Sequence, residues 1–271
     1  MVKKVFFNAS LPRAGSTLLQ NVMMQNPEIY STPTSGIVEF LLNARTLYST
    51  GDAFKAQDPK EMEKGFQGFC KAGLYGFFDA ITDRPYVIDK SRAWTGNFRF
   101  ANFIEPNPKV IVMVRDLRGI FASMEKNYRK NPHKDPLIVN GAQLQNMTAD
   151  SRLKHFSVSP PIGPSLEWLK DAIQQGYDQH FLFIRFEDFT KDPETEIKRI
   201  YNYLDIPYFK HDFENVEQLT YENDVIHGIF GDHEIHPIIK PLMEDYTSIL
   251  GFQNCDIIKQ NYAWYFDKFN Y

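Results

Sequence analysis

Residues 5–20 of the chain, VFFNASLPRAGSTLLQ, decide the predicted fold. Their apolar start is typical of a buried strand, and a helix is predicted to open at about Ser16 after a tight turn. This junction places Gly15, Ser16 and Thr17 where free backbone N–H groups and the positive end of the helix dipole point outward together. The stretch therefore predicts an anion-binding corner, and a plain strand–turn–helix corner capped by Ser16 is the simpler alternative.

The same turn departs from the phosphate-binding loop of kinases and NTPases. In that loop, G-x-x-x-x-G-K-[ST], a lysine follows the second glycine and reaches the β- and γ-phosphates. Here Ser16 follows Gly15, Ser10 stands at the position of the first glycine, and the nearby cation is Arg13 inside the turn. The corner is therefore expected to hold a phosphate-like group without the usual lysine.

Strand and helix patterns alternate along the chain. Strands are predicted over Lys4–Ala9, Tyr86–Asp89, Val110–Val114 and Phe181–Phe186. Helices are predicted over Ser16–Gln25, Ile37–Ser49, Lys60–Ile81, Leu117–Tyr128, Pro164–Gln175, Pro193–Leu204 and Asp256–Phe269. This alternation indicates βαβ units and an α/β fold with a central, mainly parallel sheet flanked by helices. No composition shift divides the chain, so residues 1–271 are expected to form a single domain.

Two stretches interrupt the alternation. Residues 129–164 contain five prolines among polar residues, and residues 221–241 contain two glycines, three histidines and two prolines. Long irregular segments in a compact α/β domain often serve as lids or substrate-binding loops. Both stretches are therefore predicted to be excursions that cover a site.

The composition excludes several classes of protein. The net charge of −4 provides no overall field that would attract nucleic acid or an anionic membrane. Cys70 and Cys255 form neither a disulfide framework nor a metal motif, and a reducing compartment is the default for such a chain. No apolar run reaches the length of a membrane span, and the histidines show no HExxH spacing. We expect a cytoplasmic protein that needs no metal and no nucleic-acid or membrane partner.

A second anion signal lies at residues 109–124, KVIVMVRDLRGIFASM. A uniformly apolar strand ends in Arg115, Asp116 is placed to cap the next helix, and Ser123 follows about two helical turns later. Ligands of parallel sheets bind at the carboxyl ends of the strands, where Arg115 can make a bidentate contact to a phosphate. A surface ion pair between Arg115 and Asp116 is the alternative.

Together the two segments resemble the superfamily of sulfotransferases that use 3′-phosphoadenosine 5′-phosphosulfate (PAPS). The resemblance rests on PRAGST at residues 12–17 and on VRDLR at residues 114–118 followed by Ser123 and Met124. It extends through IDKS at 88–91, FIRFEDF at 183–189, DPE at 192–194 and LDIP at 204–207. The match is nearest to the branch of tyrosylprotein sulfotransferases and related bacterial enzymes. It implies a P-loop-like three-layer fold and transfer of a sulfuryl group from PAPS to an acceptor hydroxyl, with release of 3′-phosphoadenosine 5′-phosphate (PAP).

The resemblance also implies roles for individual residues. Arg13 and Lys90 are expected to be catalytic, because they can stabilise negative charge that builds on the bridging and sulfuryl oxygens. The residues expected to bind PAPS are Pro12, Arg13, Ala14, Gly15, Ser16, Thr17, Leu18, Arg115, Ser123, Phe186 and Gly228. Gly228 belongs to the glycine- and histidine-rich stretch that is expected to close over the nucleotide.

The general base for the acceptor hydroxyl departs from the family pattern. In the tyrosylprotein branch a glutamate lies in a G-E-E-type stretch shortly after the first helix, whereas residues 32–39 here read TPTSGIVE. The carboxylate is displaced to Glu39, which is the leading candidate for the base. His133, His227 and His233 lie in the predicted lid segments and are the alternatives.

Two other functions stay open on the sequence. A P-loop-type nucleotide-dependent kinase would require ATP and Mg²⁺, and the missing lysine argues against it. A non-catalytic nucleotide-binding relative is disfavoured because Arg13, Lys90, Arg115 and Ser123 are all present. The acceptor is open among small-molecule, glycan and peptide hydroxyls, and the sequence does not indicate an oligomeric state.

Overall fold

The protein is built around one five-stranded sheet. The computed structural model describes residues 3–131, 144–242 and 244–271. The strands are β1 (Lys4–Asn8), β2 (Ile29–Thr34), β3 (Tyr86–Lys90), β4 (Val110–Val114) and β5 (Phe181–Arg185). They pair in the order β2-β3-β1-β4-β5, and every pair is parallel. The predicted α/β class with a parallel central sheet is therefore confirmed.

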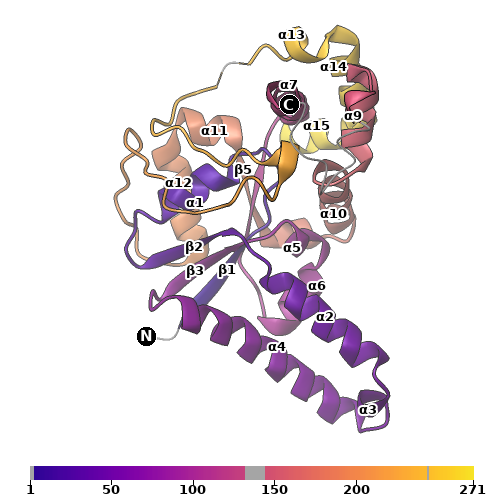
Figure 1. Cartoon of the computed structure of the whole chain (residues 1–271). Helices are drawn as coiled ribbons and strands as arrows, with labels where there is room; N and C mark the ends of the chain where they lie inside the picture. The colour runs from indigo at the N-terminus through magenta and orange to yellow at the C-terminus, as the bar shows by residue number, and fades with distance from the viewer. Residues whose placement is uncertain (1–2, 132–143, 243) are drawn as a thin grey trace.

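Helices flank the sheet (Figure 1). Those before β4 are α1 (Ser16–Met23), α2 (Ile37–Thr50), α3 (Asp52–Lys55), α4 (Pro59–Ile81), α5 (Ala93–Gly96) and α6 (Phe98–Ile104). Those after β4 are α7 (Leu117–Lys130), α9 (Ala149–Val158), α10 (Ile162–Gln174), α11 (Phe186–Lys191), α12 (Pro193–Leu204), α13 (Tyr246–Leu250), α14 (Phe252–Asn261) and α15 (Ala263–Phe269). In Figure 1, α1, α11 and α12 gather on one side of the sheet, and α2, α4, α5 and α6 on the other. Among the described residues, no helix combines the length and apolarity needed to cross a membrane.

Several features differ from the predicted elements, among them the short helices α3, α5, α6, α11 and α13, which were not predicted. β2 was not predicted, because Ile29–Thr34 lacks apolar alternation and contains Pro33, which an edge strand tolerates. The predicted C-terminal helix is two helices that meet at Tyr262. The excursion at 129–164 holds helix α9 within its described part, whereas 221–241 is irregular apart from the short 3₁₀ helix at Gly228–Phe230. His133 lies outside the described residues.

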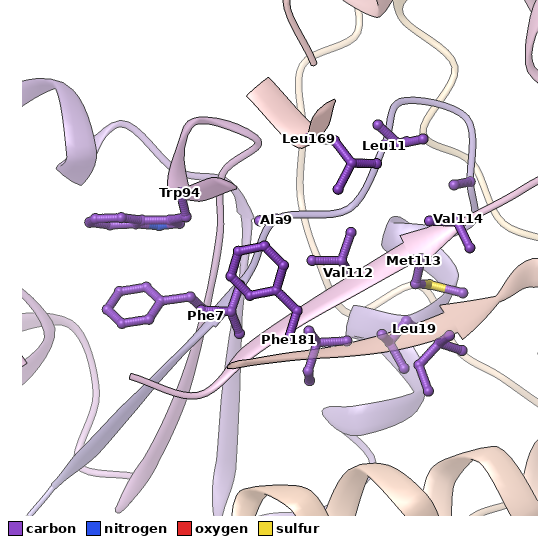
Figure 2. Close-up of a cluster of buried hydrophobic side chains, with 14 of the residues drawn as sticks. Phe7, Ala9, Leu11, Leu19, Trp94, Val112, Met113, Val114, Leu169 and Phe181 are labelled. Atoms are coloured by element: carbon purple, nitrogen blue, oxygen red, sulfur yellow. The ribbon is translucent and has the colours of Figure 1, made fainter. Parts of the chain in front are cut away.

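The core lies on both faces of β1 and β4, as the uniformly apolar sequence of β4 predicts. All five residues of β4 are buried. Figure 2 shows the buried side chains around these strands, with Phe7 of β1 beside Trp94. The centroids of these two rings lie 4.4 Å apart. This packing fixes the carboxyl ends of the central strands, from which the candidate site is built.

The strand order creates a crevice at one end of the sheet. From β1 the chain builds β2 and β3 on one side, and then crosses to build β4 and β5 on the other. In an open parallel sheet, ligands bind where the strand order reverses, outside the carboxyl ends of the strands. The reversal here lies between β1 and β4, so the loop at residues 9–15 and Arg115 meet at one place. Lys90 is paired in register with Asn8 and joins them from β3.

Candidate active site

The loop after β1 is braced by polar side chains. Asn8 is fully buried, and its Oδ1 accepts a hydrogen bond from the Ser10 amide at 3.1 Å. Its Nδ2 donates to Oε1 of Gln20 in α1, also at 3.1 Å. The Ser10 hydroxyl accepts from the Met113 amide of β4 at 2.8 Å. The loop is thus tied to a strand and to a helix before any ligand contacts it.

Gly15 occupies a position that only glycine fits. Its φ is +88°, in the left-handed region, and a Cβ placed there would lie 2.6 Å from a ring carbon of Phe186. Gly15 is also the N-cap of α1, and no side chain caps that helix. The alternative in which Ser16 merely caps the helix is therefore wrong. The amides of the first turn remain directed toward the crevice.

Two arginines join the two anion signals into one group. Nε of Arg13 donates to Oγ of Ser123 at 2.9 Å, and a guanidinium nitrogen of Arg115 donates to the Arg13 carbonyl at 2.8 Å. The Arg115 guanidinium also lies over the Phe186 ring, 4.7 Å from its centroid. Asp116 caps α7 through the Arg118 amide and pairs with Arg118. The predicted cap is confirmed, and the alternative surface pair between Arg115 and Asp116 is wrong.

A single cavity of about 1360 Å³ opens at this end of the sheet. The predicted site residues that line it are Pro12, Arg13, Gly15, Ser16, Thr17, Leu18, Glu39, Lys90, Arg115, Phe186, His227 and His233. Three other predicted site residues do not line the cavity. Ala14 is buried in the core, Ser123 contacts Arg13, and Gly228 lies between the lining residues His227 and Phe230.

Lys90 lies at the centre of the cavity wall. Its Nζ is 3.4 Å from Oγ1 of Thr17 and 3.5 Å from Oε2 of Glu222. Burial lowers the pKa of the Lys90 ammonium, and the Glu222 carboxylate opposes this shift. Lys90 is therefore a desolvated cation beside the first turn of α1.

The irregular segment at 221–241 brings a group of titratable side chains to the same wall. Glu222 Oε1 lies 2.9 Å from Nε2 of His227 and 3.7 Å from Nε2 of His233. Burial acts to raise the pKa of Glu222, but the nearby Lys90, Thr34 amide and His233 outweigh it and hold the pKa below its ordinary value. Glu222 therefore stays ionised.

His233 is held in one orientation by a carboxylate. Its Nδ1 contacts Oδ1 of Asp224, and its backbone amide donates to the other oxygen of that carboxylate at 3.1 Å. Burial lowers the pKa of His233, although Asp224 and Glu222 oppose the shift. With a proton on Nδ1, Nε2 keeps a free lone pair toward the cavity.

Glu39 lies apart from this group. It is an exposed residue in the first turn of α2 at the edge of the cavity. Glu222 and Asp224, by contrast, were not predicted. Neither belongs to a periodic pattern or a motif, and the available signal was the concentration of histidines and carboxylates in one irregular stretch.

The Glu222–His227–His233 group also has the composition of a metal site. Its ligand atoms lie within 4.8 Å of one another. Two imidazoles and one carboxylate suit a divalent transition metal. The Lys90 ammonium beside Glu222, however, already supplies a positive charge to this carboxylate.

A glycine turn at a helix N-terminus and two arginines at the switch point of a parallel sheet are typical of a group-transfer protein. Comparison with known proteins makes the class specific. The family described as "Sulfotransferase family" matches residues 6–210, and the chain belongs to that family.

Individual relatives are more distant. Carbohydrate sulfotransferase 1 from Rattus norvegicus and from Mus musculus is 31% identical over 117 residues, which is 39% of this chain and 25% of each relative's length.

Solved structures share the fold. The sulfotransferase domain from the Synechococcus PCC 7002 olefin synthase is 18% identical, with a TM-score of 0.54 over 97% of this chain and 95% of that domain. The domain from the curacin biosynthetic pathway is 16% identical, with a TM-score of 0.55 over 97% and 98%. Sulfotransferase STF9 from Mycobacterium avium is 13% identical, with a TM-score of 0.58 over 99% and 77%.

Proposed function

We propose that this protein transfers a sulfuryl group from PAPS to an acceptor hydroxyl and releases PAP. The observation that carries the proposal is the convergence of Arg13, Lys90 and Arg115 on one cavity. These cations lie at the carboxyl ends of three adjacent strands, β1, β3 and β4, around a loop whose glycine has a positive φ at a helix N-terminus. A donor with anionic groups at both ends matches cations placed in this way.

The donor would lie across the crevice between β1 and β4. The first-turn amides of α1 and the Arg13 guanidinium would hold the 5′-phosphosulfate end. Arg115 and Ser123 would hold the 3′-phosphate. Phe186, against both Gly15 and Arg115, would support the nucleotide between these ends.

The reaction is an in-line displacement at sulfur. The acceptor oxygen forms a bond to sulfur while the bond between sulfur and the bridging oxygen breaks, and its electron pair passes to the phosphate of PAP. Lys90 and Arg13 would neutralise the charge that builds on the bridging and sulfuryl oxygens. Lys90 suits this role because it is desolvated and lies within 3.4 Å of a loop hydroxyl.

His233 is the general base that the geometry supports best. Asp224 fixes its Nδ1, and Nε2 faces Glu222 and the cavity. Because burial keeps this imidazole neutral, Nε2 can accept the proton of the acceptor hydroxyl as the bond to sulfur forms. Glu39 stays the alternative base, and it would act from the exposed edge of the cavity.

No step of this mechanism uses a metal ion. The cations that the transition state needs are side chains of the chain itself, so turnover is expected to persist without divalent metal. A metal held by Glu222, His227 and His233 would instead make turnover sensitive to chelation.

The acceptor is proposed to be a small molecule, a glycan or a peptide that carries a hydroxyl. The partial match to carbohydrate sulfotransferase 1 makes sugar hydroxyls the first class to test. Val38, Leu42 and Trp168 add an apolar wall to the cavity, which also suits phenols and apolar alcohols.

Formation of PAP from PAPS, measured with sugar, phenol and alkyl acceptors in the presence of EDTA, tests the proposal. We expect acceptor-dependent PAP that EDTA does not change and that ATP with Mg²⁺ does not replace. Turnover of ATP instead of PAPS would identify a kinase. PAP binding without turnover of any acceptor would identify a non-catalytic relative.

A further inference from the structure

Arg13, Lys90 and Arg115 are each paired with a carboxylate from one segment of the chain, which comprises residues 222–242 and 244 of the described residues. The pairs are Lys90 with Glu222 at 3.5 Å, Arg13 with Asp232 at 2.8 Å and Arg115 with Glu244 at 2.5 Å. The three cations lie at the carboxyl ends of β1, β3 and β4. The sheet topology brings the cations together, but it does not explain why all three pair with carboxylates of the same irregular segment.

Two of these pairs coincide with the expected ends of the donor. Asp232 lies on Arg13, which would hold the phosphosulfate, and Glu244 lies on Arg115, which would hold the 3′-phosphate. Arg115 is largely desolvated, with 8% of its side chain exposed, and Arg13 has 20% exposed. Buried guanidinium groups need anionic partners, and the two carboxylates supply them.

Each carboxylate has a second source of stabilisation when its arginine turns away, although Glu244 itself has only 7% of its side chain exposed. Oε1 of Glu244 lies 3.0 Å from Nζ of Lys126, so a second cation remains when Arg115 turns away. Asp232 has 35% of its side chain exposed and can be solvated by water. The arginines lack such a substitute, so a competing phosphate would take the arginines and leave the carboxylates satisfied.

The segment is anchored to the rest of the chain on both sides of Asp232. Asn21 Oδ1 accepts hydrogen bonds from the amides of Leu219 and Thr220 just before it. The Val216 amide donates to the Pro237 carbonyl at 2.7 Å and so holds the chain again on the far side. Between these anchors lies Asp232, and its contacts to Arg13 come from the backbone carbonyl and the side chain.

We propose that Asp232 and Glu244 are internal stand-ins for the two anionic ends of the donor, and that PAPS displaces them when it binds. This inference rests on the proposed function. It means that donor affinity is set by a competition between donor phosphates and carboxylates of the chain's own segment 222–244. The alternative is that the same carboxylates hold the arginines in place while the donor is bound.

The two possibilities predict opposite signs in a calorimetric titration with PAP. Asp232→Asn and Glu244→Gln remove the competing charge, so each is expected to tighten PAP binding by about three- to tenfold. If the carboxylates instead position the arginines, both variants bind PAP more weakly, and the proposal is overturned. The matched control is Glu217→Gln, because Glu217 is exposed just before the same segment, does not line the cavity, and forms no ion pair with the described residues. It is expected to change PAP affinity by less than about twofold.

Two further measurements separate an effect on PAP binding from an effect on folding. The rise in Tm that PAP produces is expected to be larger in Glu244→Gln than in the wild type, even if the free variant is less stable. In an Arg115→Ala background, Glu244→Gln is expected to lose its effect on PAP affinity, and an unchanged effect would contradict the proposal. If the wild type itself does not bind PAP, the proposed function fails. If the wild type binds PAP and both variants bind it more weakly, only the proposal that Asp232 and Glu244 compete with the donor is rejected.

Discussion

The loop at residues 8–17 and the segment at 222–244 face each other across one cavity, but they are held by different forces. The loop is fixed by short-range geometry: Asn8 and Ser10 tie it to β4 and α1, and Gly15 fits a position without space for a Cβ. The segment has almost no regular structure, and its side chains are held by ion pairs to residues far away in the chain. The loop that is proposed to bind the donor is therefore held by local geometry, whereas the segment with the proposed base is held by ion pairs.

This difference has a functional consequence. A rigid loop presents its amides at fixed positions, which is what stabilisation of a developing charge requires. A segment held by ion pairs can instead be released by an anion that competes for the same cations.

The largest effect is expected at Lys90, the cation that both regions share. Lys90→Met removes the ammonium beside Thr17 and Glu222, so we expect kcat to fall about a thousandfold with a smaller change in PAP affinity. Steady-state kinetics and calorimetry with PAP check this. Lys90→Arg keeps the charge and should restore part of kcat, and a Met variant with wild-type kcat would remove Lys90 from the mechanism.

A smaller loss is expected from the proposed base. His233→Asn keeps a donor toward Asp224 but removes Nε2, so kcat should fall about a hundredfold. Because burial lowers the pKa of His233, the wild-type imidazole should stay neutral through pH 7, and activity should be lost only below the ordinary histidine pKa of about 6.5. The pH profile of kcat measures this limb, which His233→Asn should abolish.

Glu39→Gln is the matched comparison for the base. Glu39 is exposed and lies outside the group at Glu222, so its amide variant should change kcat by less than about threefold. If Glu39→Gln is severely impaired and His233→Asn is not, the base lies in α2, and the irregular segment has no direct part in proton transfer.

The last prediction concerns the geometry of the loop and is measured as stability and PAP binding, not as turnover. Gly15→Ala places a Cβ at positive φ and against Phe186, so it should destabilise the protein by about 2 kcal/mol and weaken PAP binding about tenfold. Gly65→Ala is the control, because Gly65 lies inside α4 with open space around it. It should raise stability by about 0.5–1 kcal/mol in denaturant unfolding. Equal effects of the two changes would show that the loop is not strained.

The same contrast explains what could be predicted from the sequence. The corner at Gly15, the buried strand β4 and the cap at Asp116 depend on residues close in the chain, and the structure confirms each of them. β2 was missed because its sequence, Ile29–Thr34, lacks the continuous apolar run of a central strand and contains a proline. An edge strand tolerates both features, since one side of it faces away from the sheet and needs no backbone hydrogen bonds.

The rest of the site depends on contacts between distant residues. Glu222 meets Lys90 across 132 positions, and Asp232 meets Arg13 across 219. No local pattern marks such partners, because an ion pair requires only opposite charge and proximity in the folded chain. The histidines of 221–241 could be named as candidates, but Asp224, which orients His233, emerges only from the fold.

A calorimetric titration of PAP into the wild-type protein and into Arg115→Ala tests the proposed donor site most directly. The wild type should bind one PAP per chain, and loss of the guanidinium should weaken binding by about tenfold or more, because a charged contact to a phosphate is removed. Absence of PAP binding to the wild type, or equal affinity in Arg115→Ala, would contradict the assignment of this cavity as a PAPS site.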